Sequence, residues 1–223
     1  MKKVLHLFLL IILLFAGCAT FKSAIEGQYD GAIEKNFGAD RVDVLFIFSH
    51  YRQTVGYDAI PKLDNQYQRI SGFDDFFRDA LTELSNINAY ATYTEYASDV
   101  NEPERRALKD SLIATHDYVI SIRFMRQKSF AKYFLGTIGS TVTLTLVPIP
   151  YHHSYSVGVE IYNSQRQLIQ TYSRNSGLTK WVQALLIFIY PFHPERRKTE
   201  ELYVEFLHDI FRQIESENVL KAL

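Results

Sequence analysis

Cysteine is almost absent from this 223-residue sequence, in which Cys18 is the only one. One cysteine cannot form an intramolecular disulfide, so the fold must be held together by its apolar core, even in an oxidising compartment. An excess of charge of either sign is also missing, because the formal net charge is only -1. A nucleic-acid binder needs a concentrated basic surface. We therefore expect no nucleic-acid partner.

Apolar and aromatic residues, by contrast, are plentiful. Hydrophobic residues make up 47% of the chain, charged residues 22%, and there are 16 Phe and 15 Tyr. This composition is typical of a globular protein with a substantial core rather than of a disordered chain. The length fits one domain with a short extra segment.

The first residues have the three-part layout of an export signal. Lys2 and Lys3 form a basic start, an apolar run from Val4 to Phe15 follows, and small residues then precede Cys18. The apolar run is shorter than the roughly 20 residues that a membrane-spanning helix needs. The sequence therefore predicts a signal peptide over residues 1–17, removed by cleavage between Gly17 and Cys18.

The stretch Leu14-Phe15-Ala16-Gly17-Cys18 resembles the lipobox of bacterial lipoprotein precursors. Phe15 stands where that family prefers leucine, whereas Ala16, Gly17 and Cys18 match. The resemblance implies a diacylglyceryl group on the Cys18 thiol and a fatty acid, typically palmitate, on the new amino terminus. It also implies a membrane partner through this lipid. Ala19 follows the cysteine, where aspartate retains such proteins at the inner membrane of enteric bacteria, so the resemblance favours the outer membrane over the inner one.

Hydrophobic patterns place the elements in the first half of the chain. The run at 42–49 indicates a buried strand, 50–70 a long loop, and Ser71 the N-cap of a helix whose apolar residues continue to Leu84 on one face. A strand at 90–96, a helix at 102–116 that begins with Pro103, and a strand at 117–124 follow.

The second half has more β-strand character. Thr and aliphatic residues alternate at 141–147, which indicates a half-exposed strand, and a strand from Tyr155 turns at 163–165 into its hairpin partner at 167–173. Pro194 begins a last helix, with Leu202, Phe206, Ile210 and Ile214 on one side.

This order predicts an α/β or α+β fold with a mixed sheet of about five to six strands, flanking helices, and a C-terminal antiparallel hairpin plus helices. We expect a lipid-anchored tether at 18–40 and a single globular domain at 41–223. The pattern at 41–125 resembles the small N-terminal α/β domains of the curli-secretion lipoprotein and of the Tol-system propeller protein. That resemblance implies a fold and carries no functional residue across.

The apolar segment 178–192 is the strongest candidate for contact with a membrane or a partner. As a helix it would span about 22 Å, short of the roughly 30 Å of a bilayer core. It could be a core helix, lie in the membrane interface, or form a docking surface; the apolar stretch 133–149 could join it. The candidate contact residues are Trp181, Leu185, Leu186, Phe188, Ile189, Tyr190, Arg196 and Arg197.

The sequence contains no recognisable catalytic or metal-binding motif. His152 and His153 would point to opposite faces of a strand and fit a turn better than a metal site, and the G-x-S-x-G signature of many hydrolases is missing. We expect no metal, no cofactor and no catalytic residue.

These features predict a non-enzymatic, lipid-anchored envelope protein with a binding or assembly role at the outer membrane, and with an envelope protein as its partner. Two alternatives stay open. The protein could carry a lipid or hydrophobic ligand between the sheet and the segment 178–192, or it could be a cell-envelope hydrolase.

Overall fold

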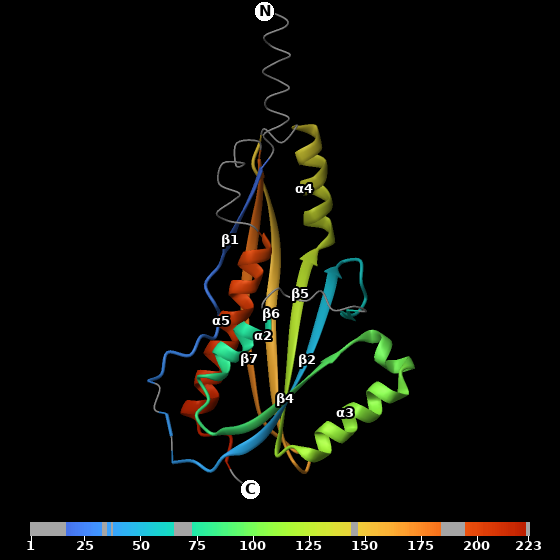
Figure 1. Cartoon of the computed structure of the whole chain (residues 1–223). Helices are drawn as coiled ribbons and strands as arrows, with labels where there is room; N and C mark the ends of the chain where they lie inside the picture. The colour runs from blue at the N-terminus through green and yellow to red at the C-terminus, as the bar shows by residue number, and fades with distance from the viewer. Residues whose placement is uncertain are drawn as a thin grey trace, which may run out of the picture.

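The computed structural model describes residues 17–32, 35–36, 38–64, 73–143, 147–183 and 195–221. Within them, seven strands form one mixed sheet in the order β1-β7-β6-β5-β2-β3, and β4 pairs with the first part of β2 (Figure 1). Helices pack on both faces of this sheet. The mixed α and β architecture expected from the sequence is confirmed.

The element bounds are as follows. The strands are β1 (Gly17–Lys22), β2 (Val42–Val55), β3 (Lys62–Leu63), β4 (Ile87–Glu95), β5 (Tyr118–Ser129), β6 (Ile149–Asn163) and β7 (Leu168–Gln183). The helices are α2 (Phe73–Leu81), the 3-10 helix η1 (Ala97–Asn101), α3 (Pro103–Thr115), α4 (Phe130–Val142) and α5 (Glu195–Ser216).

Strand β2 lies at the centre of the parallel part of the sheet, with β4 and β5 parallel to it on either side. Its first half is buried on both faces, because Val44, Phe46 and Phe48 point to one side while Leu45 and Ile47 point to the other. A continuous apolar run is what a strand covered on both faces requires. From β5 onward the neighbours are antiparallel.

The main core lies between the sheet and α5. Leu202, Phe206, Ile210 and Ile214, the residues expected on one side of the last helix, are all buried there. Helix α2 adds Phe77, whose ring meets that of Phe46 edge-on at 4.9 Å between centroids. Fully burying such a side chain contributes about 1.5–3 kcal/mol, so this layer carries much of the stability. A smaller cluster beneath α3 covers the other face.

Two segments expected to be irregular or extended have a different structure. The loop predicted at 50–70 instead begins as a continuation of β2 to Val55 and contains the short strand β3, while residues 65–70 and the predicted N-cap Ser71 lie outside the described residues. The start of the strand predicted at 141–147 is wrong, because helix α4 runs to Val142, and residues 144–146 lie outside the described residues. There the Thr137 and Thr141 hydroxyls donate to the carbonyl oxygens four residues earlier, each at 2.9 Å, so the threonines are satisfied within the helix.

The segment 178–192 is not a helix where the structure describes it. Leu178 to Gln183 complete β7 and pair with β1 on one side, and Leu178 to Val182 also pair with β6 on the other. Two ladders of hydrogen bonds therefore pair the backbone of this segment with its neighbours. The remainder, at 184–192, lies outside the described residues.

The region expected to be a tether, residues 18–40, contributes structure of its own. Its first residues belong to β1, an edge strand of the sheet. Further on, the amides of Tyr29 and Asn36 donate to the carboxylates of Asp209 and Glu215 on α5. Much of the segment therefore lies against the domain.

Candidate functional site

The predicted lipidation residue lies at one end of the long sheet. Strands β6, β7 and β1 extend beyond the last residue of β5 that pairs with β6, so this end is a narrow three-stranded ribbon (Figure 1). The backbone of Cys18 pairs with Val182, which pairs in turn with Ile149. We call this the anchor end. The C-terminus lies at the opposite end of the molecule.

Helix α4 stands beside the ribbon at the anchor end (Figure 1). Ser129 caps it by accepting a hydrogen bond from the Lys132 amide. Gly136 and Gly139 face the ribbon so closely that a Cβ on Gly136 would lie 3.1 Å from the ring of Tyr151. Glycine is therefore what lets α4 pack on β6. No residue of α4 is buried.

The candidate contact residues from the sequence are only partly described. Trp181 lies half-buried in β7, in register with Ala19 and Pro150, so it does belong to the anchor end. Arg197 is an exposed residue of α5 whose guanidinium pairs with Glu201 at 3.2 Å. Arg196 belongs to the same helix, and its side chain is not described. Leu185, Leu186, Phe188, Ile189 and Tyr190 lie outside the described residues.

A cluster of charges joins the start of α5 to the ribbon. Glu195 lies 3.1 Å from Arg126 and from Lys180, and 3.6 Å from His153. His153, with Lys180 and Arg126, lowers the pKa of Glu195 to about 2. A carboxylate at the first turn of a helix also benefits from the helix dipole. The Glu195 carboxylate is therefore ionised at neutral pH, and it lies between the side chains of Arg126, Lys180 and His153.

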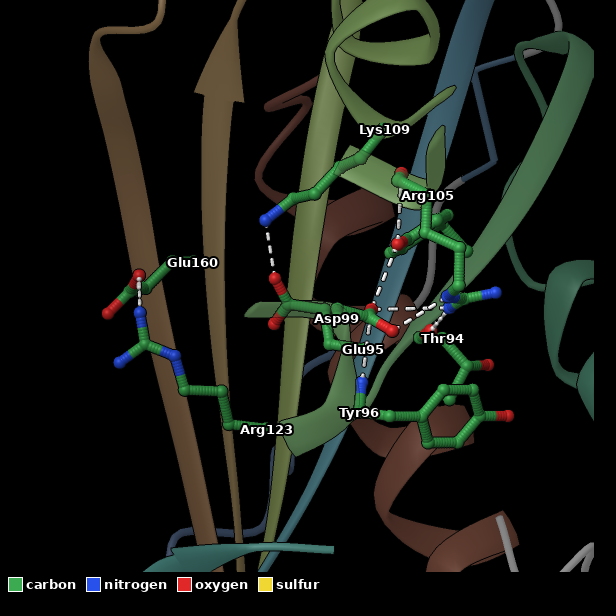
Figure 2. Close-up of polar contacts among 9 residues, drawn as sticks. Thr94, Glu95, Tyr96, Asp99, Arg105, Lys109, Arg123 and Glu160 are labelled. Carbon is green, nitrogen blue, oxygen red and sulfur yellow. Dashed lines mark hydrogen bonds and ion pairs between the residues drawn. The ribbon is translucent and has the colours of Figure 1, made fainter. Parts of the chain in front are cut away.

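A second polar cluster links β4, η1 and α3 on the other face of the sheet (Figure 2). The Arg105 Nε donates to Asp99 at 2.7 Å, and the Tyr93 hydroxyl and the Tyr96 amide donate to the other carboxylate oxygen at 2.9 and 3.2 Å. The Arg105 guanidinium also donates to the Thr94 carbonyl at 2.7 Å.

This arrangement holds the Asp99 carboxylate in its ionised form. Burial alone would raise the pKa of Asp99, but the bonds from Arg105, Tyr96 and Tyr93 outweigh it and lower the pKa. Burial and the adjacent carboxylate raise the pKa of Tyr93 to about 12. An ionised acid with both oxygens occupied, beside a phenol held neutral, is suited to fixing η1 onto α3 rather than to moving protons.

Two further ion pairs flank this cluster (Figure 2). Lys109 of α3 pairs with Glu95, and Arg123 of β5 pairs with Glu160 of β6 at 2.7 Å. Arg123 is half-exposed. The pairs give this side of the sheet a surface of alternating charge, a type of surface that favours specific partner orientation over raw affinity.

Three of the described histidines differ in their surroundings. His208 lies between two carboxylates, 2.9 Å from Glu83 and 3.2 Å from Asp79, so both of its nitrogens are engaged. His152 and His153 lie within β6 rather than in the turn that the sequence suggested, with His153 buried and His152 exposed. In the described ranges, no three His, Cys, Asp or Glu side chains converge as a metal site would require.

Two depressions in the described part of the chain are lined mainly by polar residues. One of about 320 Å³ lies beside β1 and is lined by residues that include Glu26, His152, Ser154 and Asn175. A carrier of a hydrophobic ligand needs a mainly apolar pocket, so this depression lends that alternative no support. Among the described helices, none has the length and apolar character needed to cross a membrane.

The comparisons with known proteins add little. The sequence matches no protein-family model and no curated protein. Two solved structures of the PelC dodecamer from Paraburkholderia phytofirmans are similar at 8% identity, with TM-scores of 0.28 and 0.26. Each covers 87% of this chain, which spans 98% and 97% of theirs. At TM-scores this low, the likeness bears on neither the fold nor the function.

Proposed function

We propose that the chain is a non-enzymatic lipoprotein of the bacterial envelope, anchored through lipid on Cys18 and acting in binding or assembly at the outer membrane. The observation that carries the proposal is the match of Ala16, Gly17 and Cys18 to the lipobox after a short apolar run. The position of Cys18 near the start of the edge strand β1, at one end of the sheet, supports it, because the end of a sheet can be brought next to a membrane.

Anchoring at this position would hold the domain close to the membrane. The segment after β1 is attached to the domain at Glu26, which bridges to Asn175, and at Tyr29, which donates to Asp209. A domain bound this way stands directly on its anchor, whereas a flexible linker of the same length would let it range over tens of ångströms.

The far side of the domain is then available to a partner. Helix α3 and η1 expose Leu108 and Val100, and the same two elements carry the charged side chains of Lys109 and Asp99, with Arg123 and Glu160 beside them in the sheet (Figure 2). Isolated apolar residues surrounded by paired charges are typical of the polar, orientation-setting rim of a protein interface. We therefore propose an envelope protein as the partner.

Metabolic labelling tests the anchor. Cells producing the full chain are fed an alkyne-bearing palmitate, and the purified protein is examined for label. We expect label on the natural chain and none after Cys18→Ser, which leaves no cysteine to modify. Ala19→Asp is the matched control: it should keep the label and move the protein to the inner-membrane fraction. Normal labelling of Cys18→Ser would overturn the proposal.

Crosslinking in intact cells tests the partner. A photo-reactive amino acid at position 108 should yield one reproducible adduct with an envelope protein, and the same residue at position 168, also exposed but in β7 rather than in α3, serves as the control. Adducts that are absent, or identical at both positions, would count against a specific partner on α3.

A further inference from the structure

Helix α4 carries an exposed apolar stripe, which meets another part of the described protein at Phe130, whose ring stacks on that of Tyr57 at 5.7 Å between centroids. Phe130, Phe134, Ile138 and Val142 recur every four residues, which places them on one side of the helix. All four are exposed, as is Leu135 beside them. Soluble domains rarely leave so much apolar surface together, and when they do it marks a contact site.

The orientation of this stripe is fixed by the opposite side of the helix. Gly136 and Gly139 lie against Ile149 and Tyr151 of β6, so α4 turns its narrow, side-chain-free side to the ribbon. Tyr133 packs on Tyr151 at 5.0 Å between ring centroids. Because the glycines face β6, the apolar stripe on the other side of the helix points away from the sheet.

The stripe lies next to the proposed lipid. Ile149, which contacts Gly139 of α4, is two strands from Cys18 through the register Ile149–Val182–Cys18. Adjacent strands are about 4.8 Å apart, so the backbones of Cys18 and Ile149 are separated by roughly 10 Å. Acyl chains on Cys18 would bring the bilayer surface to the level of α4.

The charges around the helix fit a phospholipid surface. Helix α4 contains Lys132 and no acidic residue, and Lys128 precedes it with its ammonium 4.7 Å from the ring centre of Tyr133. Lysines beside an apolar stripe, with tyrosines at the boundary, are the pattern of an interfacial helix near anionic headgroups. A helix of this length spans about 20 Å, too short to cross the roughly 30 Å core.

We propose that α4 lies in the bilayer interface at the anchor end, with its stripe among the lipid chains, as a second membrane contact beside the lipid on Cys18. This rests on the proposed lipidation and deepens it. The diacylglyceryl group and the fatty acid on Cys18 would already anchor the chain stably, so the role of the helix would be to fix how the domain is oriented on the membrane.

Tryptophan quenching tests the placement. The chain has one tryptophan, so Trp181→Phe gives a silent background. Into it we place either Val142→Trp on α4 or Val100→Trp on η1, a matched control because the two valines are 76% and 72% exposed. Both full chains are isolated with their lipid, checked by palmitate label, and reconstituted into vesicles of phosphatidylethanolamine and phosphatidylglycerol containing acyl-brominated lipid.

We expect bromolipid to quench Val142→Trp strongly and Val100→Trp hardly at all. Equal quenching of the two, with the label intact, would overturn the proposal for α4 while leaving the anchor standing. Loss of the palmitate label in the natural chain would instead overturn the anchor. A blue-shifted emission of Val142→Trp without lipid, unaffected by bromolipid, would assign the stripe to a second copy of the chain and also overturn the membrane proposal.

Discussion

Arg174 of β7 and Asp209 of α5 form an ion pair in which both side chains are almost wholly buried, at 5% and 8% exposure. The same guanidinium donates to the Gln213 side chain, and the same carboxylate accepts the Tyr29 amide at 3.0 Å. Three separate parts of the chain, β7, α5 and the segment after β1, are thus joined at one charge pair.

Asp209→Ala should lower the free energy of unfolding by about 3–5 kcal/mol, because it leaves Arg174 as an uncompensated buried charge. Glu205→Ala is the control on the same helix: its pair with Lys22 is partly exposed, and exposed pairs contribute about 0–1 kcal/mol. Urea denaturation of the purified chains measures both. Equal losses in the two variants would show that burial does not determine how much the Arg174–Asp209 pair contributes to stability.

Glu195 should make the free energy of unfolding depend on pH in the acidic range. Its pKa in the folded protein is about 2, below the ordinary 4.5, because of His153, Lys180 and Arg126. A depressed pKa means that the ionised carboxylate stabilises the fold fully above about pH 4.5, and that this contribution is lost as the pH falls toward 2.

Glu195→Gln should therefore lower the free energy of unfolding by about 1–2 kcal/mol at pH 7, and the difference from the natural chain should shrink steadily below pH 4.5. Denaturation curves across this range decide the matter. A difference that stays constant down to pH 3 would place the effect in packing rather than in charge.

Some of this architecture follows directly from the sequence. Helix α5 repeats its apolar residues at helical spacing from Leu202 to Ile214, and β2 is a continuous apolar run, so both are predictable from local pattern. The structure of the run that begins at Leu178 is not predictable in this way, because a short apolar stretch fits a buried strand as well as a core helix. Here the strand is selected by β1 and β6 on its two sides, and the β1 pairing partner lies more than 150 residues away.

The candidate site is likewise predictable from local sequence in some residues and not in others. The neighbours of Cys18 alone predict it as the lipidation residue. The apolar stripe of α4 was hidden by the alternation at 141–147, although the spacing of Phe130, Phe134 and Ile138 was a helical signal. The contacts of Asp99 and of Asp209 depend on where turns and helices bring side chains together, which local sequence does not specify.

Arg105 should be needed for the attachment of η1 and α3. Its planar guanidinium donates to Asp99 and Thr94 and lies over the ring of Tyr93, 4.9 Å from its centre. Lysine cannot reproduce this geometry, so Arg105→Lys should cost about 1–2 kcal/mol and increase amide hydrogen exchange within α3.

The neighbouring Arg106→Lys supplies the comparison, because Arg106 is exposed. Hydrogen exchange followed by mass spectrometry resolves α3 from the sheet. Unchanged protection of α3 in Arg105→Lys would mean that the apolar contacts of Leu112 and Ile113 hold the helix without the arginine.

Glu215 should decide whether the segment before β2 stays attached to the domain. Its buried carboxylate accepts the Asn36 amide and the Ser85 amide, each at 3.1 Å, together with the Ser85 hydroxyl. Removing the acceptor leaves these donors unpaired, which costs about 1–3 kcal/mol for each donor that stays buried.

In Glu215→Ala we therefore expect the segment around Asn36 to detach and become sensitive to protease, while the sheet stays protected. Glu217→Ala, two residues further on, removes a carboxylate that accepts from Gln213 and Tyr172, so it should leave the protease pattern around Asn36 unchanged. Equal cleavage near Asn36 in both variants would mean that α5 as a whole, rather than Glu215, holds the segment in place.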